Sequence, residues 1–566
     1  MRLPVVCSLL VLICCTAFSQ NPEIYDVVIH EVLPKPTPVL ALPPYEYIEL
    51  YNRSVHSYNL ENWQLKVNSR TVSLPAYLLK PDSLIVFCSV AGAEAYHQSN
   101  IVGISRFPAI SDDTALITLF DSKHKVIHAI DYNQGWYGSV SKNGKSLEMI
   151  DIGKPCYEKA NWLPSSSSTG GTPGTMNSVH GQWTDDSRPD LLYAVWLDSL
   201  TIRLLFSKSL DSSIATNPTY YKISPDLPLK AIKAVPPLFK EVDLSLLDPV
   251  YTEVLYQITT NGLLDCTGKE SDLYNTTILG KGKKPQKGNI VINELLVNPS
   301  PGIPKFIEVY NRSDKPIALD QLYFSSRKKD GSLSTFRKLA VLPRILPASD
   351  YLAFTTNAEA LCQHFICKAK DKIATINSLP TMAMDEGSVI LLSADSTIID
   401  DVRYSDSLFF PLMTNNRDVS IERLSPEQAS DISSNWHTAS NIYNGATPGF
   451  ENSQRWVAAV NPPIIAIQPA LITPDLIIDN KAILSWELPQ PGYVGNVNIY
   501  DIQGKLVRQL ARNILLGNSG NLSWNGTNEA SEILPSGVYI FLIEIFNLQG
   551  SIMRWKRTVT LARKLK

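Results

Sequence analysis

Four glutamates in two similar segments are the residues whose type and spacing best suit chemistry. Glu31 and Glu49 lie in VVIHEVL and YEYIELYNRS, and Glu294 and Glu308 lie in IVINELL and KFIEVYNRS. If adjacent strands bring each pair together, two carboxylates can bind calcium or act as acid and base. Calcium needs about 6–8 oxygen ligands and no Asp-rich loop accompanies the pairs, so we favour glutamates on outer strand faces or bonded to backbone amides at a sandwich edge. All four are therefore only weak candidates for a metal site.

Other side chains suited to catalysis form no recognisable set. The eight histidines are scattered, without H-E-x-x-H or another metal-ligand spacing. His124 and His128 are four residues apart, but their alternating neighbours predict a strand or hairpin, not the helix that would direct both at one metal. Neither a G-x-S-x-G nucleophile elbow nor a Walker or dinucleotide glycine pattern occurs. We predict no catalytic residue and no cofactor.

Aromatic residues flank two of the glutamates, at Tyr47, Tyr51, Phe306 and Tyr310. Such rings can form a platform that stacks on sugars or bases. We favour the other interpretation, in which they are packing pairs across neighbouring strands.

The elements that carry these residues belong to a long internal repeat. Glu49 and Glu308 occupy the same place in two copies, 259 residues apart. The copies also end alike, in NWLPSSSSTGGTPGTMNS at 161–178 and NWHTASNIYNGATPGFENS at 435–453. A unit of about 150 residues is far longer than the ~20–50 residues of a solenoid repeat, so each copy should be an independent domain. We expect Trp162 and Trp436, in the closing strands, to anchor the two cores.

Hydrophobic alternation within the repeats predicts strands. Apolar residues alternate with polar ones over short stretches bounded by Pro, Gly, Asn and Asp, as at 45–51, 83–89, 115–121 and 388–393. This period of two is typical of half-buried strands in an all-β sandwich. Ile48 and Leu50 should therefore face one side of their strand and Glu49 the other.

The order of these motifs resembles the lamin tail domain of secreted bacterial proteins. The pattern [NH]-E-[VL]-L is followed by [YF]-I-E-[LV]-Y-N-R-S, by an acidic turn before a strand (SDDTALITLF and MDEGSVILLS), and by N-W and T-P-G. The resemblance covers both copies and implies an immunoglobulin-like β-sandwich without catalytic residues, used for binding and surface architecture. His30 stands where the second copy has Asn293, and from this difference we expect no shared chemical role at that position.

The remaining segments also resemble small β-sandwich modules. Residues 188–279 resemble the bacterial Ig-like domain of exported proteins, and GKGKKPQKG at 280–288 has the composition of a solvated linker. Residues 462–566 resemble both the Ig-like domain of flagellar hook-capping proteins and the C-terminal sorting domains of type IX secretion cargo. We interpret their basic end, SIMRWKRTVTLARKLK, as an edge strand protected from aggregation, in preference to a patch for an anionic partner.

Together these patterns predict an all-β string of immunoglobulin-like β-sandwich domains. The expected parts are a signal peptide at 1–19, the first lamin-tail copy at 21–180, the Ig-like domain at 188–279, the linker at 280–288, the second lamin-tail copy at 289–453 and the C-terminal Ig-like or sorting domain at 462–566.

The N-terminus and the charge balance indicate an exported protein. Arg2, an apolar run at 3–18 and an A-F-S cleavage site at 17–19 have the pattern of a secretory signal peptide. That run is shorter than the ~20 residues that span a bilayer and no later run is longer, so we expect no transmembrane segment in the mature chain. With 51 Lys and Arg against 54 Asp and Glu, the chain has no overall attraction to nucleic acid.

Five cysteines remain after the signal peptide: Cys88, Cys156, Cys266, Cys362 and Cys367. Cys362 and Cys367 are close enough to bridge a short loop in an oxidising compartment, and the other pairings stay open. No C-x-x-C pair suggests structural zinc.

The function that these expectations favour is a non-catalytic scaffold or binding protein. We expect it to be secreted or to lie on the outer surface of a Gram-negative bacterium, with a protein or a polysaccharide at the cell surface as its partner. The alternative is an extracellular hydrolase, or an accessory module of a secreted nuclease or polysaccharide-degrading system, because the lamin tail domains that this chain resembles accompany secreted nucleases.

Overall fold

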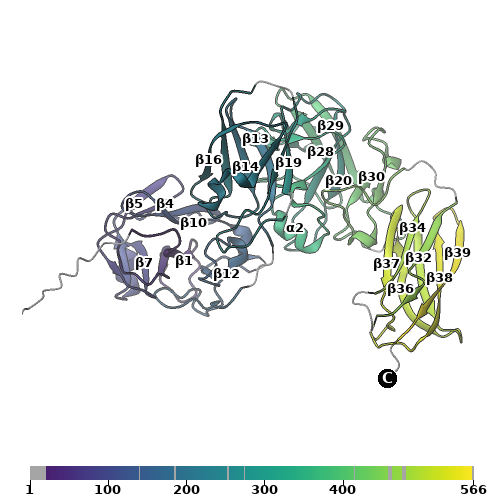
Figure 1. Ribbon diagram of the computed structural model, residues 1–566, viewed down its shortest axis with the longest axis horizontal. Helices are drawn as coiled ribbons and strands as arrows, with labels where there is room; N and C mark the ends of the chain where they lie inside the picture. Colours follow the sequence, from purple (N-terminus) through teal and green to yellow (C-terminus); the bar gives the residue numbers. More distant parts are fainter. Residues whose placement is uncertain are drawn as a thin grey trace, which may run out of the picture. The chain divides into compact units, whose positions relative to one another are not determined.

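The protein is a string of immunoglobulin-like β-sandwiches, as its sequence predicts (Figure 1). The computed structural model describes residues 21–138, 140–183, 187–250, 254–272, 275–413, 415–456, 462–474 and 480–563. The predicted signal peptide lies outside the described residues. The chain divides into two compact units, one formed by 1–187 with 236–238 and the other by 188–235 with 239–566.

The first copy of the repeat is a two-sheet sandwich. Its six-stranded sheet has the order β12 (Trp162–Pro164), β11 (Leu147–Met149), β1 (Val27–Leu33), β2 (Tyr47–Asn52), β7 (Leu84–Ser89) and β8 (Ile101–Ile104). Its four-stranded sheet has the order β10 (Val126–Asn133), β9 (Thr114–Phe120), β4 (Gln64–Val67) and β5 (Arg70–Ser73), and β3 (Tyr58–Asn59) pairs with β6 (Leu78–Leu79). One buried cluster joins the sheets, with Ile48 and Leu50 from one and Leu65 and Ile117 from the other.

The second copy repeats this topology strand for strand. The large sheet has the order β31 (Trp436–Thr438), β30 (Ile421–Arg423), β20 (Ile290–Leu296), β21 (Phe306–Asn311), β26 (Tyr351–Thr355) and β27 (Ile373–Thr375). The small sheet has the order β29 (Ile398–Ser405), β28 (Glu386–Ser393), β23 (Leu322–Ser325) and β24 (Arg337–Lys338), and β22 (Ile317–Ala318) pairs with β25 (Ile345–Leu346). The repeat therefore includes the closing strands, and their Trp162 and Trp436 are buried core residues as predicted.

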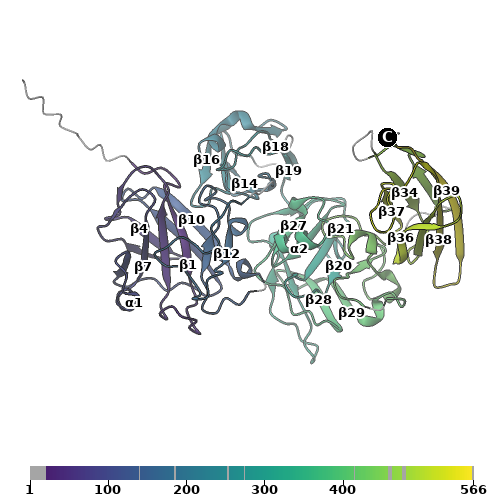
Figure 2. The same cartoon turned by 90° about the horizontal axis from the view of Figure 1, so that it is seen from below.

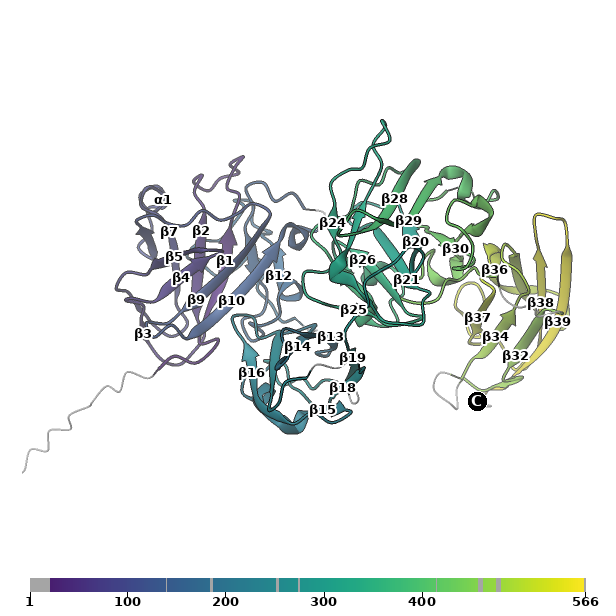
Figure 3. The ribbon, with the colours of Figure 1, turned by 90° about the horizontal axis from the view of Figure 1, so that it is seen from above.

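A short helix covers part of the outer face of each large sheet. Figures 2 and 3 show α1 (Val90–Tyr96) beside β7, and Figure 2 shows α2 (Ala358–His364) beside β27. The side chains of Ser89 and Asn357 accept hydrogen bonds from the first turns of these helices and so fix where they begin. Beneath the helices lie Tyr47 in the first copy and Phe306 in the second.

Two smaller sandwiches complete the string. The Ig-like module has one sheet of β13 (Leu191–Trp196), β14 (Thr201–Phe206), β17 (Glu241–Leu246) and β16 (Leu229–Val235), and another of β15 (Tyr221–Ser224), β18 (Tyr256–Thr260) and β19 (Asn275–Leu279). The C-terminal module has one sheet of β32 (Ile464–Gln468), β34 (Ala482–Glu487) and β37 (Ser519–Trp524), and another of β33 (Leu471–Ile472), β39 (Ile552–Leu561), β38 (Gly537–Phe546), β35 (Val494–Tyr500) and β36 (Leu506–Leu515) (Figure 3).

The segments beside the second copy are held by hydrogen bonds. In the stretch predicted as a linker, the Lys283 N–H donates to Pro316 O at 2.8 Å, and the Ala318 N–H donates to Lys283 O at 3.0 Å. After the last strand of the copy, the Asn518 N–H of the C-terminal module donates to Ser453 O at 2.9 Å. Part of the linker therefore pairs with β22 instead of being solvated throughout.

The cysteines agree with an oxidising compartment. Cys362 and Cys367, at the end of α2 and just after it, form the predicted disulfide, with Cα atoms 5.4 Å apart. Cys156 takes part in a disulfide bond, and so does Cys266. Cys88 is a buried free thiol on β7.

Candidate functional site

The structure brings the recurrent glutamates together in each lamin-tail copy and adds a third to each set. On the first large sheet, Glu31 lies opposite Glu49 on β2 and opposite Glu148 on β11. On the second, Glu294 lies opposite both Glu308 on β21 and Glu422 on β30. All six carboxyl side chains are fully buried. We call each set of three a carboxyl cluster.

Sequence reasoning missed the third member of each cluster. Glu148 lies in SLEM at 146–149 and Glu422 lies in SIER at 420–423. The shared S-[LI]-E at the same place in both copies was the signal that could have found them. The serines of this motif also contribute, because Ser146 Oγ donates to Glu31 Oε1 at 2.6 Å and Ser420 Oγ donates to Glu294 Oε1 at 2.5 Å.

In the first copy, the carboxyl cluster holds the segment at 165–179, which we call the closing loop. The Thr172 N–H donates to Glu31 Oε1 at 2.8 Å, and the Gly174 N–H donates to Glu49 Oε2 at 2.6 Å. Glu148 Oε2 accepts from the Val179 N–H at 3.1 Å. Each glutamate thus accepts a hydrogen bond from a backbone N–H of the closing loop. Without this bond, the N–H would be buried with no hydrogen-bond partner.

In the second copy, the closing loop at 439–454 is held in the same way. The Thr447 N–H donates to Glu294 Oε1 at 2.8 Å, and the Gly449 N–H donates to Glu308 Oε2 at 2.6 Å. Glu422 accepts from the Ser453 N–H at 3.0 Å and from the Gln454 N–H at 2.8 Å. The arrangement matches the interpretation in which the glutamates bind backbone amides, and it recurs in two sequences that differ around it.

The glycine of each T-P-G motif has a backbone conformation that other residues rarely adopt. Gly174 has φ +80° and Gly449 has φ +82°. A side chain at either place would also meet neighbouring atoms, Gln98 and Asn100 at Gly174 and Lys372 at Gly449. Glycine is therefore required where the loop turns its amide toward the second glutamate of the cluster.

His30 and Asn293 have the same role, contrary to our expectation from their different chemistry. His30 Nδ1 is 2.7 Å from Glu49 Oε1, and Asn293 Nδ2 donates to Glu308 Oε1 at 2.8 Å. Both residues lie at a β-bulge, between Ile29 and Glu31 in β1 and at the matching place in β20. The bulge adds one residue to the strand and breaks the simple alternation of its side chains. The side chain of the bulge residue, His30 or Asn293, therefore lies on the same face as the glutamates.

Tyr47 and Phe306 occupy the same position in the two copies and differ by one hydroxyl group. The closing loop of each copy has a residue of matching size beside this position. Tyr47 Oη donates to Glu31 Oε1 at 2.6 Å, and a Cβ at Gly171 would clash with this hydroxyl. In the second copy Phe306 has no hydroxyl, and Ala446 takes the place of Gly171. The two pairs fill the same space with a hydroxyl in one copy and a methyl group in the other.

Burial dominates the electrostatics of the carboxyl clusters. Burial, together with the nearby carboxylates of Glu49 and Glu148, raises the pKa of Glu31 to about 8. Burial and the carboxylate of Glu422 likewise raise the pKa of Glu294 to about 8. In both cases the hydrogen bonds that the carboxyl accepts act in the opposite direction but are weaker.

The geometry does not suit a bound cation. N–H and O–H donors converge on the carboxyl oxygens, and a cation would have to displace them. Over the residues that the structure describes, no group of three or more His, Cys, Asp or Glu side chains is placed to hold a metal ion.

The other residues singled out from the sequence are used in packing. Tyr47 stacks edge-on against Tyr96 of α1, with ring centroids 5.9 Å apart, and Tyr310 packs across the strand pair on Tyr351 at 4.6 Å. His128 Nδ1 accepts from the Ile29 N–H at 2.9 Å, and its Nε2 lies 2.9 Å from Pro155 O. His124 lies in the turn between β9 and β10, as the hairpin interpretation predicted.

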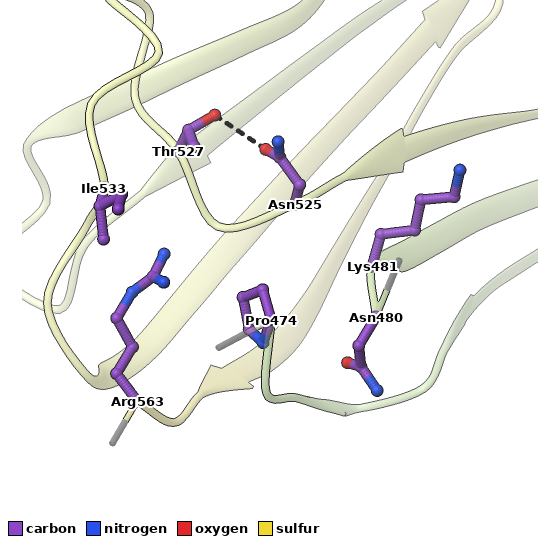
Figure 4. Close-up of a pocket in the computed structure, with 7 residues that line it drawn as sticks. All are labelled: Pro474, Asn480, Lys481, Asn525, Thr527, Ile533 and Arg563. Atoms are coloured by element: carbon purple, nitrogen blue, oxygen red, sulfur yellow. Dashed lines mark hydrogen bonds between the residues drawn. The ribbon is translucent and has the colours of Figure 1, made fainter. Parts of the chain in front are cut away.

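A hollow of about 310 Å³ lies in the C-terminal module between Lys481 and Arg563 (Figure 4). The connection between β37 and β38 forms part of its wall, and the Arg563 guanidinium donates to two carbonyls of this connection, to Leu534 O at 2.7 Å and to Gly526 O at 3.0 Å. Figure 4 shows the bond from Thr527 Oγ1 to Asn525 Oδ1, which is 2.8 Å long, beside the same hollow. The arginine therefore has a structural role here.

The comparisons with known proteins identify the repeated region. Residues 20–134 and 283–406 match the model of the Lamin Tail Domain. Both matches end before the third glutamate and the closing loop, so the repeat in the structure is longer than the matched regions. No curated protein matches the chain.

Several solved bacterial structures are similar to parts of the chain. The N-terminal part of the bacterial S-layer protein SbsC has 15% identity over 39% of this chain and 44% of that one, with a TM-score of 0.17. FLGD from P. aeruginosa has 19% identity over 18% of this chain and 78% of that one, with a TM-score of 0.14. A DUF4876 family protein from Bacteroides thetaiotaomicron has 10% identity over 38% of this chain and 82% of that one, with a TM-score of 0.18. The chain spans less than half of the S-layer fragment.

Among the described residues, no helix has both the length and the apolar character needed to cross a membrane.

Proposed function

The chain contains two lamin tail domains, and from this premise we propose that it is a non-catalytic scaffold or binding protein of the cell exterior. The proposed partner is a protein or a polysaccharide at the surface of a Gram-negative cell, contacted through the loops and faces of the sandwiches. Export by the predicted signal peptide and the disulfide between Cys362 and Cys367 support this location.

One observation carries the proposal of a non-catalytic role. In both copies the buried acids, which are the strongest candidates for acid–base chemistry in the sequence, are used to hold the closing loop. A catalytic carboxyl has to reach a substrate. Glu31 and Glu294 are instead fully buried beneath backbone that they bind themselves.

The test separates a scaffold from an extracellular hydrolase. The purified mature chain is assayed on nucleic acids and polysaccharides, beside a variant with Glu31→Gln and Glu294→Gln. On intact cells, surface cross-linking of a tagged chain should recover the same neighbours for both proteins. Hydrolysis by the wild-type chain that the double variant loses while it remains folded would overturn the proposal.

We propose in addition that residues 462–566 act as a sorting module for a second export step, the other possibility being a β-sandwich spacer. The support is the resemblance of N-I-Y-D-x-x-G-K and P-S-G-V-Y in this segment to known sorting domains. A chain without 462–566 should accumulate, folded, in the periplasm. Its normal appearance at the surface or in the medium would contradict the sorting role.

A further inference from the structure

A threonine hydroxyl lies between two carboxyl groups in the second copy. Thr447 Oγ1 is 2.9 Å from Glu294 Oε2 and 2.8 Å from Glu422 Oε1. A hydroxyl has a single hydrogen, so it can donate to one of these oxygens only. The second contact is a hydrogen bond only if the other carboxyl carries a proton and donates it to the hydroxyl oxygen.

The remaining contacts show which carboxyl carries that proton. Besides Thr447, Glu422 accepts from the Ser453 N–H on Oε1, and from Ser453 Oγ and the Gln454 N–H on Oε2. Donors therefore converge on both oxygens of Glu422, which suits an ionised carboxylate. On Glu294 the Ser420 hydroxyl and the Thr447 N–H both donate to Oε1, which leaves Oε2 as the atom for the proton.

The first copy has the same arrangement. Thr172 Oγ1 is 3.4 Å from Glu31 Oε2 and 3.1 Å from Glu148 Oε1. Glu148 Oε2 accepts from Ser178 Oγ at 2.7 Å and from the Val179 N–H. On Glu31 the strong donors again converge on Oε1. In this copy the donors to Glu148 other than Thr172 fall on Oε2 alone, so the contacts repeat the shared threonine hydroxyl but not the double set of donors on the third glutamate. The pKa of Glu31, which burial and the neighbouring carboxylates raise to about 8, favours Glu31 as the residue that carries the proton.

We propose that each lamin tail domain stores one buried proton, on Oε2 of Glu31 in the first copy and of Glu294 in the second, and that this proton latches the closing loop. With the proton present, a chain of hydrogen bonds runs from the first glutamate through the threonine hydroxyl to the third glutamate. Without it, two adjacent buried carboxylates repel each other and share a hydroxyl that can serve only one of them. Loss of the proton should therefore release the loop.

The surrounding charges favour the protonated form. Around Glu294 the groups that titrate or carry charge are Glu308, Glu422, Arg423, Tyr443 and Arg455. Arg423 is directed away from the cluster, because its guanidinium binds Asp400 and Ile292 O. Around Glu31 they are His30, Tyr47, Glu49, Tyr96 and Glu148. Burial holds His30 neutral by lowering its pKa to about 4, so no cation there offsets the glutamates near neutral pH.

The experiment measures opening of the closing loop on the full mature chain. Amide hydrogen exchange is followed from about pH 6 to pH 10 at Thr447 and Gly449, after correction for the intrinsic rate. If opening releases one proton, the opening equilibrium should rise by about tenfold per pH unit below the pKa of Glu294, which burial raises to about 8, and level off above that pKa. Exchange that stays independent of pH after correction would overturn the proposal.

Two matched glutamine variants locate the proton. In Glu294→Gln, the amide can donate permanently to the Thr447 hydroxyl and its oxygen can still accept, so the loop should stay closed at alkaline pH. In Glu422→Gln, an NH₂ group would face converging donors, so the loop should open at every pH. The opposite ranking of the two variants would show that Glu422 holds the proton and would overturn the assignment.

A second measurement does not depend on the behaviour of the loop. Difference infrared spectra near neutral pH should contain the C=O band of a protonated carboxyl. The band should lose intensity in the double variant Glu31→Gln and Glu294→Gln. Burial also raises the pKa of Glu49 and of Glu308 well above the usual range, so a band that remains belongs to these two carboxyls. Its absence from the wild-type chain, or an unchanged intensity in the double variant, would also overturn the proposal.

Discussion

At the scale of single residues, the two lamin tail domains use different side chains at equivalent positions beside the carboxyl cluster. The first domain uses a histidine, a tyrosine and a glycine where the second uses Asn293, Phe306 and Ala446. His30 and Asn293 keep the second glutamate of each cluster bonded, and Tyr47 donates to the first glutamate where Phe306 packs beside Ala446. The two copies therefore supply matched controls for substitutions within one chain.

The first prediction concerns the Tyr47–Gly171 pair. Gly171→Ala should destabilise the first domain by about 1–3 kcal/mol, because the new methyl group clashes with the Tyr47 hydroxyl. Adding Tyr47→Phe should restore part of the loss, since the pair then matches Phe306 and Ala446, whereas the contacts of the new methyl group with Glu31 and Leu42 remain. Urea unfolding of the four members of the double-mutant cycle measures the coupling. Additive effects would contradict a shared space.

The second prediction concerns acid stability. Burial lowers the pKa of His30 and of His128 to about 4, so their contribution to stability is present above the unfolded value of 6.5 and is lost as the pH falls toward 4. The second domain has Asn293 and Asp400 at these places, and Asp400 accepts from the Ile292 N–H as His128 does from Ile29. We expect the first domain to lose stability in this range more steeply than the second, as hydrogen exchange of their separate peptides will show. His30→Asn should reduce the difference.

The third prediction concerns the pH dependence of stability that follows from the raised pKa of the glutamates. The folded pKa of Glu31 and Glu294 is raised to about 8 from 4.5, so their contribution to stability is complete below pH 4.5 and is lost as the pH rises through about 8. The urea midpoint of the wild-type chain should therefore fall over this interval relative to the double variant Glu31→Gln and Glu294→Gln. Parallel pH profiles of the two proteins would contradict a buried proton at these positions.

At the scale of elements, the β-bulge and the short closing strand decide how each domain is completed. The bulges in β1 and β20 place His30 and Asn293 beside the second glutamate of each cluster, and β12 and β31 lead the chain into the closing loop. The closing strands are only three residues long. Their hold on the sandwich therefore depends on the buried tryptophan that each contributes.

The fourth prediction tests this dependence. Replacing Trp162 by Ala should cost about 3–5 kcal/mol in the first domain only, and replacing Trp436 should do the same in the second only. The reason is that Trp162 and Trp436 lie in separate hydrophobic clusters. Amide hydrogen exchange of each variant, followed separately for peptides from the two domains, provides the measurement. Equal destabilisation of both domains by one substitution would show a common core.

At the scale of the whole molecule, hydrogen bonds hold the segments at both ends of the second lamin tail domain. Lys283 in the predicted linker pairs with the second lamin tail domain, and Gln454 after its last strand donates to Leu516 O of the C-terminal module at 2.8 Å. Gln454 also bonds Glu422 of the carboxyl cluster. The end of this closing loop thus contributes both to its own domain and to the contact with the next module.

The fifth prediction concerns limited proteolysis, which tests the proposed domain plan. We expect cleavage near 184–188, within 280–288 and within 454–463, because few contacts should cross such boundaries. Residues 184–186 and 457–461 lie outside the described part of the chain. The bonds of Lys283 and Gln454 should shift the cuts to their C-terminal sides. Early cleavage inside β2, with these segments intact, would contradict the plan.

The sequence by itself determined the fold class, the repeat and the pairs of recurrent glutamates, because strand alternation and motif spacing are local properties of the chain. It also indicated the disulfide between Cys362 and Cys367, which are five residues apart. Only the tertiary structure decided that Glu148 and Glu422 complete the clusters, since strands more than a hundred residues apart bring them to Glu31 and Glu294. The shared role of His30 and Asn293 was hidden for a related reason: a bulge depends on pairing with the neighbouring strand, and simple alternation assigns these side chains to the wrong face.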